Sequence, residues 1–372
     1  MPLILDTDPS HLSLRSCTKR CAKPSPACLD RSSRNLTIGL INNMPDSALE
    51  ATERQFISLL DLASEGFTIR VILYSLPGVS RSGASAGRVS EFYTSAENLP
   101  DSQLDGLIVT GREPLTPNLA DEPYWESFTA VLDWARNHTY STVWSCLAAH
   151  AAVLYQDGIK RVKSEHKHFG VFDCERVSKH PLTEGIPSCF KVPHSRWNGL
   201  SEDELAARGY NVLSRAADAG VDTFVQQNKS LFVFFQGHPE YEPNTPLLEY
   251  RRDIGRFVRG EIGTYPAMPR GYFDENSLAR LTDLQQDSAA GPQEGLMAGV
   301  LEILERVDLQ NTWRSTAIRL YRNWLEYIGA KKLAELQAAS ATKEELVRAG
   351  SYVNVGELSG RLEPGQPGLA IL

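Results

Sequence analysis

Short apolar runs alternate with segments of helical periodicity, and this pattern constrains the chain more than any other feature of its sequence. Each run has the length of one strand, and its continuous apolar character is typical of a parallel strand covered on both faces. The intervening segments repeat apolar residues at helical spacing, as helices packed on a sheet do. We therefore predict an α/β fold with a doubly wound, mostly parallel sheet. The expected strands are Leu36–Ile41, Thr68–Tyr74, Gly106–Gly111, Ser141–Cys146 and Ser230–Gly237.

Composition divides the chain into three regions. Residues 1–35 are polar and predict a loosely structured arm, whereas residues 36–329 carry the alternating elements and predict one domain. Within it, residues 160–230 are expected to complete the fold with shorter elements. Residues 330–372 predict a helical or flexible tail. The expected helices are 48–63, 123–137, 147–156, 246–259, 297–307 and 314–328, with two short ones after Gly329, the second capped by Thr342 and Glu345.

Charge and hydropathy exclude several classes of function. The formal net charge of -8 argues against nucleic acid as a partner, because phosphate binding requires a basic face. No apolar run approaches the length of about 18 residues that a membrane-spanning helix needs. The first residues include Asp6 and Asp8 and lack the basic and apolar segments of a secretory signal. We therefore expect a cytoplasmic protein with neither membrane nor nucleic-acid partners.

Six cysteines are present, three of them in the polar arm. Cys17, Cys21 and Cys28 form no CxxC pair, and His11 is the only other soft ligand near them. In a reducing compartment no disulfide framework is expected either. We therefore predict ordinary thiols and no bound metal.

Cys146 ends an expected strand and precedes an expected helix. Ligands of open α/β sheets bind at the carboxyl edge of the strands, which is where this side chain would stand. The helix N-terminus presents backbone N–H groups and a positive dipole end, and both favour a thiolate. A buried structural cysteine remains the alternative interpretation.

His238 follows the last expected strand in a Gly-His-Pro-Glu turn. This position brings it to the same sheet edge as Cys146, so the two side chains can come within reach although they are far apart in sequence. Glu240 lies two residues further on and can accept the second imidazole N–H. The three residues together predict a nucleophile, its base and the group that orients the base.

Cys146, His238 and Glu240 lie within a set of motifs that follow one another in a fixed order along the chain. The chain resembles the homoserine O-succinyltransferases and acetyltransferases of the methionine pathway, and the match covers about 36–272 and 312–328. The resemblance implies a class I glutamine amidotransferase-like fold. The motifs are the Asn-x-Met-Pro segment at 42–45 with its downstream Glu and Gln-Phe, DGLIVTG, PYW, STVWSCLAAHAA, VPHSRW, GHPEY, EYRRD, and WRS with NWLEY.

The resemblance implies roles for particular residues. Cys146 would receive the acyl group from acyl-CoA as a thioester, with His238 as general base and Glu240 orienting it. The family's substrate-binding residues fall here on Lys167, Ser195 and Arg252. The expected substrates are L-homoserine and succinyl-CoA or acetyl-CoA, with no bound cofactor. Backbone N–H groups of Leu147 and Gly111 are the expected oxyanion donors.

Three departures from the family pattern stand out. Lysines often follow the family's Asn-x-Met-Pro segment, whereas Asp46 and Ser47 follow here, which calls an oxyanion lysine into question. In the family a Gly in the next loop admits succinyl and a Glu favours acetyl. The corresponding position here is Leu115, beside Arg112 and Glu113; Arg112 can pair with a succinyl carboxylate, which favours succinyl. Finally, residues 276–311 are expected to be an insertion and 330–372 an added tail, either of which can serve a homodimer.

Three alternatives stay open at this point. A glutamine amidotransferase or related hydrolase would use the same Cys–His–Glu set, but its elbow usually reads Gly-x-Cys-x-Gly, whereas Trp144 and Ala148 stand here. A non-catalytic α/β binding protein would tolerate loss of Cys146. Serine in place of homoserine as acceptor changes only one methylene, a difference worth about 1–3 kcal/mol.

Overall fold

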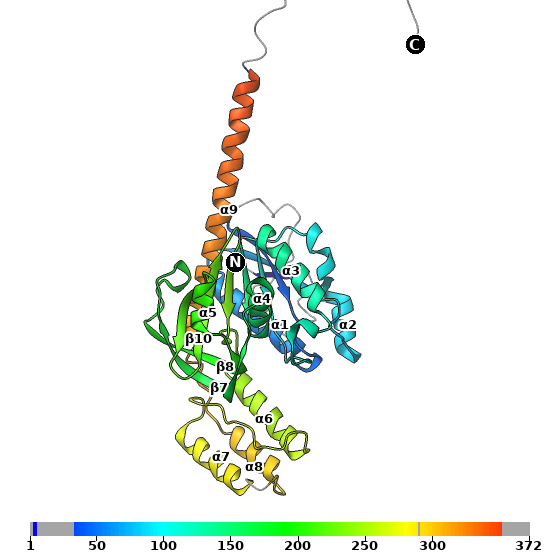
Figure 1. Ribbon diagram of the computed structural model, residues 1–372, viewed down its shortest axis with the longest axis vertical. Helices are drawn as coiled ribbons and strands as arrows, with labels where there is room; N and C mark the ends of the chain where they lie inside the picture. Colours follow the sequence, from blue (N-terminus) through cyan, green and yellow to red (C-terminus); the bar gives the residue numbers. More distant parts are fainter. Residues whose placement is uncertain (1–2, 6–32, 289–290, 352–372) are drawn as a thin grey trace, which may run out of the picture.

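The computed structural model describes residues 3–5, 33–288 and 291–351. An eleven-stranded sheet forms its centre, in the order β1-β3-β2-β5-β6-β11-β10-β9-β7-β8 with β4 beside β3 (Figure 1). The strands are β1 Leu3–Leu5, β2 Asn35–Ile41, β3 Thr68–Ser75, β4 Thr94–Ser95, β5 Gly106–Val109, β6 Ser141–Ser145, β7 Val162–Arg176, β8 Cys189–Gly199, β9 Asn211–Ala216, β10 Gly220–Gln227 and β11 Leu231–Phe235.

The sheet has a parallel half and an antiparallel half. Strands β1, β3, β2, β5, β6 and β11 run parallel to one another, and the five buried runs expected from the sequence are β2, β3, β5, β6 and β11. Strands β10, β9, β7 and β8 continue the sheet by antiparallel pairing. The α/β prediction is therefore confirmed.

The expectation of shorter elements in residues 160–230 was wrong for β7 and β8. These are the longest strands of the sheet, with 15 and 11 residues. The first half of β7 is mostly exposed and polar, and its pairing with β8 shifts register between Lys163 and His168. A polar, irregular start of this kind carries no period-2 signal, which explains why the sequence pattern did not reveal the strand.

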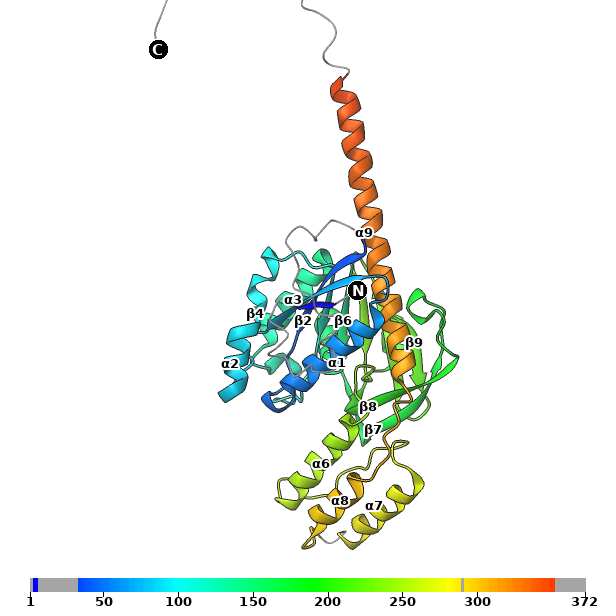
Figure 2. The ribbon, with the colours of Figure 1, turned by 180° about the vertical axis from the view of Figure 1, so that it is seen from behind.

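Helices cover both faces of the sheet. On one face α1 (Leu49–Ala63) and α9 (Arg314–Ser351) bury their apolar sides, and on the other face α3 (Trp125–His138) and α4 (Leu147–Asp157) do so (Figures 1 and 2). The short α5 (Glu202–Ala207) packs with the second group through Leu205. The polar α2 (Gly83–Phe92) buries none of its residues. None of the helices in the described ranges combines the length and apolarity needed to cross a membrane.

Three helices pack together below one end of the sheet. α6 (Thr245–Val258) contacts α8 (Leu296–Leu304), and α7 (Glu275–Asp287) contacts α8 in turn (Figure 1). A separate apolar cluster joins them and includes Tyr250, Leu281 and Val300. Whether residues 276–311 are an insertion stays a prediction, but their helices pack on the helix that follows the Gly-His-Pro-Glu turn.

The last described helix corrects the expectation of two short helices after Gly329. α9 runs without a break through Gly329 to Ser351, where two short helices had been expected. Gly329 does not end the helix: a Cβ there would lie 2.7 Å from Phe67 Cε1, so the glycine allows α9 to pack closely on the body. Thr342 does not cap a new helix either, because its hydroxyl donates to the Ala338 carbonyl at 3.0 Å inside α9.

The two chain ends are described only in part. Leu3–Leu5 form a strand that pairs in parallel with β3, so this piece of the arm is ordered into the sheet rather than loose. The three cysteines of the arm and the last residues of the tail lie outside the described residues.

Candidate active site

Cys146 occupies the sharp turn between β6 and α4. Its φ of 54° makes it the one non-glycine residue with a positive φ among those the structure describes. Such backbone conformations are costly and persist where the surroundings hold them. The Cys146 amide donates to the Phe235 carbonyl at 2.7 Å, which ties the turn to β11. The side chain is partly exposed, as expected of a nucleophile elbow at the edge of an α/β sheet.

The register of two strands brings His238 to Cys146. β6 and β11 run in parallel with Ser145 opposite Phe235, so both strands end at the same level. His238 follows three residues after Phe235, and its amide donates to the Pro193 carbonyl at 2.8 Å. Cys146 lies close enough to His238 for the sulfur to act on the pKa of the imidazole. The two residues paired by the sequence analysis therefore meet in the structure.

Glu240 completes the expected set of three. His238 Nδ1 lies 2.8 Å from Glu240 Oε1, and both side chains are buried. Burial alone would lower the pKa of His238, but the charges of Cys146 and Glu240 and the hydrogen bonds to both raise it well above its ordinary value. The Tyr241 ring stacks on the imidazole with a centroid distance of 4.3 Å. This arrangement favours an imidazolium beside the sulfur and suits covalent catalysis.

The two expected oxyanion donors lie against each other. A Cβ built on Gly111 would stand 2.6 Å from the Leu147 amide nitrogen, so the loop after β5 touches the first turn of α4. No side chain larger than hydrogen fits at Gly111 without displacing this backbone. The first N–H groups of a helix have no partner within the helix, so the Leu147 amide is available to an oxyanion.

Two of the expected substrate-binding cations converge on one carboxylate. Lys167 Nζ lies 3.1 Å from Asp253 Oδ2, and Arg252 Nε donates to Asp253 Oδ1 at 2.9 Å. Lys167 also lies over the Phe169 ring at 4.2 Å. Lys167 is on β7 and Arg252 on α6, so only the folded chain brings them together. Sequence reasoning missed Asp253, although it stands in the same EYRRD motif as Arg252.

Ser195 is tied to the ring that covers His238. Its hydroxyl donates to Glu249 Oε2 at 2.6 Å, and the Tyr241 hydroxyl donates to Glu249 Oε1 at 2.6 Å. Burial and then the neighbouring Glu249 raise the pKa of Tyr241 well above its ordinary value, so the hydroxyl keeps its proton. Glu249 thus links an expected substrate residue to the ring that stacks on His238, the expected base. Sequence reasoning missed Glu249 and Tyr241, and the motifs EYRRD and GHPEY were the signal that could have found them.

The loop that follows Gly111 is held from within. The buried Glu122 accepts hydrogen bonds from the backbone amides of Leu115 and Thr116 at 2.7 and 2.9 Å. The Leu115 side chain is 61% exposed, while Glu113 lies 3.8 Å from Arg256 on α6. The specificity roles expected of this loop stay predictions.

The sequences of known proteins place the chain in a family. It matches the profile described as homoserine O-succinyltransferase over residues 9–334. A homoserine O-succinyltransferase from Rhodopseudomonas palustris is 45% identical over 320 residues, which are 86% of this chain and 95% of that protein. The chain belongs to the homoserine O-succinyltransferase family. A protein of the same name from Bradyrhizobium japonicum is 45% identical over 82% of this chain and 94% of its own length. The resemblance inferred from the motifs is confirmed.

Solved structures align with this homoserine O-succinyltransferase family member only at low identity. A glutamine amidotransferase from Methylobacillus flagellatus aligns at 14% identity over 79% of this chain and 95% of that one, with a TM-score of 0.44. One from Thermotoga maritima aligns at 12% identity over 79% and 98%, with a TM-score of 0.39.

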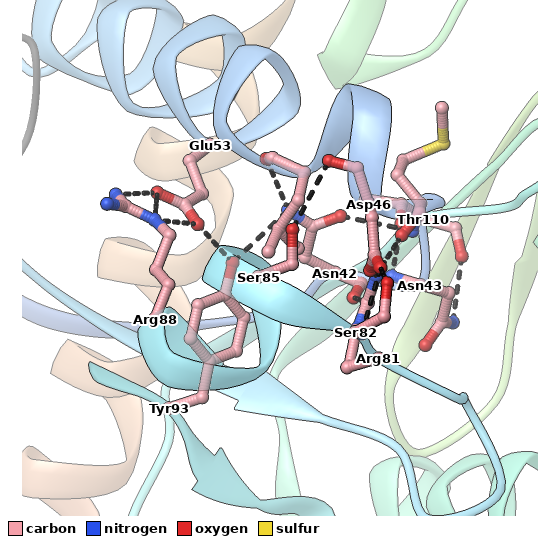
Figure 3. A network of polar contacts seen from close by, with 12 residues as sticks. Asn42, Asn43, Asp46, Glu53, Arg81, Ser82, Ser85, Arg88, Tyr93 and Thr110 are labelled. Atoms are coloured by element: carbon pink, nitrogen blue, oxygen red, sulfur yellow. Dashed lines mark hydrogen bonds and ion pairs between the residues drawn. The ribbon is translucent and has the colours of Figure 1, made fainter. Parts of the chain in front are cut away.

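The segment that departs from the homoserine O-succinyltransferase pattern has its own polar network (Figure 3). Asp46 accepts hydrogen bonds from the Ser82 amide and hydroxyl at 2.9 and 2.7 Å and lies 3.4 Å from Arg81. The pKa of Asp46 lies below its usual range, and the hydrogen bond from the Ser82 hydroxyl is the main cause. Arg81 donates to the carbonyls of Asn42 and Met44. Where the family often has lysine, this chain has Asp46, which binds the residue before α2. Arg81, whose side chain is 7% exposed, supplies the positive charge beside it.

Two further contacts hold this segment at the carboxyl edge of the sheet. The Asn43 amide donates to the Thr110 hydroxyl at 2.8 Å, and its side chain donates to the Thr110 carbonyl at 2.9 Å. The buried Glu53 receives hydrogen bonds from Arg88 and Tyr93 (Figure 3). Because Thr110 precedes Gly111, the Asn-x-Met-Pro segment helps to position the expected oxyanion loop.

A second buried cluster lies behind the His238 turn and was missed by sequence reasoning. The ligand atoms of Cys174, His194 and Asp222 lie within 4.8 Å of one another. Arg196 Nε donates to His194 Nδ1 at 3.2 Å, and a guanidinium cannot accept, so the proton of His194 is on Nε2, 3.3 Å from Asp222 Oδ1. Nε2 therefore offers no lone pair to a metal. A Cβ on Gly237 would lie 2.7 Å from Asp222 Oδ1, so this cluster packs against the turn that carries His238.

Proposed function

We propose that this protein transfers a succinyl group from succinyl-CoA to the hydroxyl of L-homoserine through a thioester on Cys146. One observation carries the proposal: in a chain 45% identical to proteins named homoserine O-succinyltransferase, a cysteine elbow with positive φ lies beside a histidine that a buried glutamate contacts at 2.8 Å. The product, O-succinyl-L-homoserine, places the protein in methionine biosynthesis.

In the first half-reaction, Cys146 Sγ attacks the thioester carbonyl of the acyl-CoA. His238 holds the thiol proton, and the negative charge passes to the carbonyl oxygen, which the Leu147 and Gly111 amides stabilise. When the tetrahedral intermediate collapses, the bond to the CoA sulfur breaks. His238 returns the proton to that sulfur, so CoA leaves as a thiol and the acyl group remains as a thioester on the enzyme.

In the second half-reaction, the homoserine hydroxyl attacks the acyl-enzyme. His238 takes the hydroxyl proton, and the same two amides stabilise the second tetrahedral intermediate. Collapse breaks the bond to Cys146 Sγ and forms an oxygen ester, and the proton returns to the sulfur. The scheme is ping-pong, and neither a metal nor a resident cofactor takes part in it.

The residues around Asp253 are suited to hold the amino acid. Homoserine carries a carboxylate and an ammonium group, and Arg252 can bind the carboxylate through two N–H groups. Lys167 provides a second positive charge and Ser195 a hydroxyl. Asp253 is the matching acceptor for the substrate ammonium. An acceptor without both charged groups could not exchange with these ion pairs.

The cellular setting follows from this chemistry. Both substrates are small metabolites of the cytoplasm, where we place the protein, with no membrane or nucleic-acid partner. Residues 330–342 of α9 are largely exposed, and a homodimer in which this helix takes part stays a prediction.

Intact-protein mass spectrometry after mixing with succinyl-CoA, without acceptor, tests the proposal. We expect a mass increase of one succinyl group that Cys146→Ala abolishes and that homoserine discharges. Cys189→Ala is the matched control because Cys189 is an exposed free cysteine at the start of β8. If neither succinyl-CoA nor acetyl-CoA labels the folded protein, the ping-pong proposal is wrong. Discharge by serine as fast as by homoserine would change the acceptor, and glutaminase activity would favour an amidotransferase.

A further inference from the structure

Three buried polar atoms without hydrogen-bond partners lie on the side of Cys146 that faces the loop after β5. They are Arg112 Nε, Glu122 Oε2 and Arg161 Nη1. All three side chains surround Tyr124: Arg112 lies over its ring at 5.9 Å, and the charges of Glu122, Arg112 and Arg161 all act on its hydroxyl. We refer to Arg112, Glu122, Tyr124 and Arg161 as the acyl-side cluster.

The acyl-side cluster is attached to the catalytic elbow by short links. Arg161 Nη2 donates to the Pro117 carbonyl at 3.1 Å, so this arginine spans from the end of α4 to the loop after β5. The same loop begins at Gly111, which touches the Leu147 backbone. Arg161 also lies near enough to Cys146 for the thiolate charge to act on it.

The cluster carries an unbalanced charge. Two guanidinium groups and one carboxylate leave a net charge of +1. Glu122 Oε1 accepts hydrogen bonds from two amides of the loop. Burial lowers the pKa of Arg161 below its ordinary value, against the opposing charge of Glu122. Buried polar atoms without partners are costly, so the two unpartnered arginine N–H groups are suited to an anion that arrives with the substrate. The unpartnered Glu122 Oε2 would repel such an anion, which must therefore bind on the arginine side of the cluster.

We propose that Arg161, with Arg112 beside it, binds the distal carboxylate of the acyl group while its other end is attached to Cys146. This inference rests on the proposed function and adds the residues that select a dicarboxylic donor. A succinyl group is four carbons long and ends in a carboxylate, so it supplies one negative charge to the cluster at a short distance from the sulfur. An acetyl group is too short and carries no charge, and it would leave the arginine atoms unpaired.

Sequence reasoning considered Arg112 for this role and missed Arg161. Arg161 lies in the polar stretch after α4, between Lys160 and Val162, where no motif marks it. Only the fold directs its side chain across to the loop that carries Pro117.

The test compares three acyl donors on Arg161→Gln, with Arg161→Lys as a variant that keeps the charge. Succinyl-CoA has the distal carboxylate, butyryl-CoA has the same chain length without it, and acetyl-CoA is shorter. The readout is the rate of acyl-enzyme formation per unit of donor concentration, followed by quenched-flow mass spectrometry. Lys160→Gln is the matched control, since it removes an exposed positive charge from the adjacent position.

We expect Arg161→Gln to lower acylation by succinyl-CoA about 10- to 100-fold, the value of a charge-assisted hydrogen bond, and to leave butyryl-CoA and acetyl-CoA within about threefold. Arg161→Lys should recover part of the succinyl rate, and Lys160→Gln should match the wild type. Equal losses for all three donors would overturn the inference and assign Arg161 to the CoA moiety or to the fold. An unchanged succinyl rate would overturn it as well. Failure of the wild type to form any acyl-enzyme would instead refute the proposed function.

Discussion

The charged groups on the two sides of Cys146 differ in whether they have partners within the protein. On the α6 side, four charged groups have partners within the protein: Lys167 and Arg252 share Asp253, and Glu249 receives hydrogen bonds from two hydroxyls. On the side of the loop after β5, Arg112 and Arg161 keep buried atoms without partners. Ion pairs within the protein are held rigidly, and a substrate with both charges can exchange with them. Arginine groups without a carboxylate partner can instead bind a negative charge that the substrate supplies. We take the first side to hold the amino acid and the second to hold the acyl group.

The largest expected effect on activity concerns Cys146, which lies between the two sides. Cys146→Ala should abolish acyl-enzyme formation and reduce overall transfer by about 10⁴-fold or more, because no other group is placed to carry the acyl chain. Steady-state assays with succinyl-CoA and homoserine measure it. A variant that retained more than about a tenth of the activity would show that the two sides do not meet at this sulfur.

The next effect concerns the base shared by both half-reactions. Glu240→Gln should reduce kcat by about 100-fold or more, because His238 loses its orienting acceptor. Glu240 also helps to raise the pKa of His238 above its ordinary value. The variant should therefore lose the imidazolium at lower pH than the wild type.

NMR titration of His238 and the alkaline limb of the pH–rate profile measure this shift. The linked stability has a definite sign. A raised folded-state pKa stabilises the fold fully below the ordinary histidine pKa of about 6.5, and this contribution disappears as pH rises through the raised value. Glu240→Gln should diminish that dependence. Glu242→Gln is the control, since its partner is Arg54 rather than the base. An unchanged titration of His238 would contradict the assigned role of Glu240.

A smaller effect is expected where the loop side touches the elbow. A Cβ at Gly111 would lie 2.6 Å from the Leu147 nitrogen, so Gly111→Ala must displace one of the two expected oxyanion donors. We expect kcat to fall about 10- to 100-fold with either acyl donor. Gly87→Ala on α2 is the control, because a Cβ there meets nothing within 4 Å. Normal kcat in Gly111→Ala would remove this loop from the oxyanion site.

The smallest effect should separate the α6 side from the acyl side. Asp253→Asn releases Lys167 and Arg252 from their shared carboxylate, and we expect the KM for homoserine to rise about 10-fold. Acyl-enzyme formation from succinyl-CoA should stay unchanged, since no acceptor takes part in it. Asp173→Asn, which removes a pair on a more exposed part of β7, should have no measurable effect. If Asp253→Asn slowed acylation instead, the assignment of the two sides would be wrong.

Local sequence patterns predicted the parts that neighbouring residues decide. A continuous apolar run specifies a buried strand, and a strand directly followed by a helix specifies the elbow at Cys146. Parallel strands end at one edge of the sheet, so the sequence alone predicts that the residues after β6 and β11 lie close together. Motif order added the family, which is shared with the relatives from Rhodopseudomonas palustris and Bradyrhizobium japonicum.

The tertiary structure decided what depends on contacts between distant segments. Asp253 became the partner of Lys167 across 86 positions of sequence, and Arg161 reached Pro117 across 44. Gly329 looked like the end of a helix, yet it lies inside α9 because close packing against Phe67 outweighs its weak helix propensity. Sequence patterns record the periodicity of one element at a time, whereas ion pairs and close contacts depend on which elements the fold places side by side.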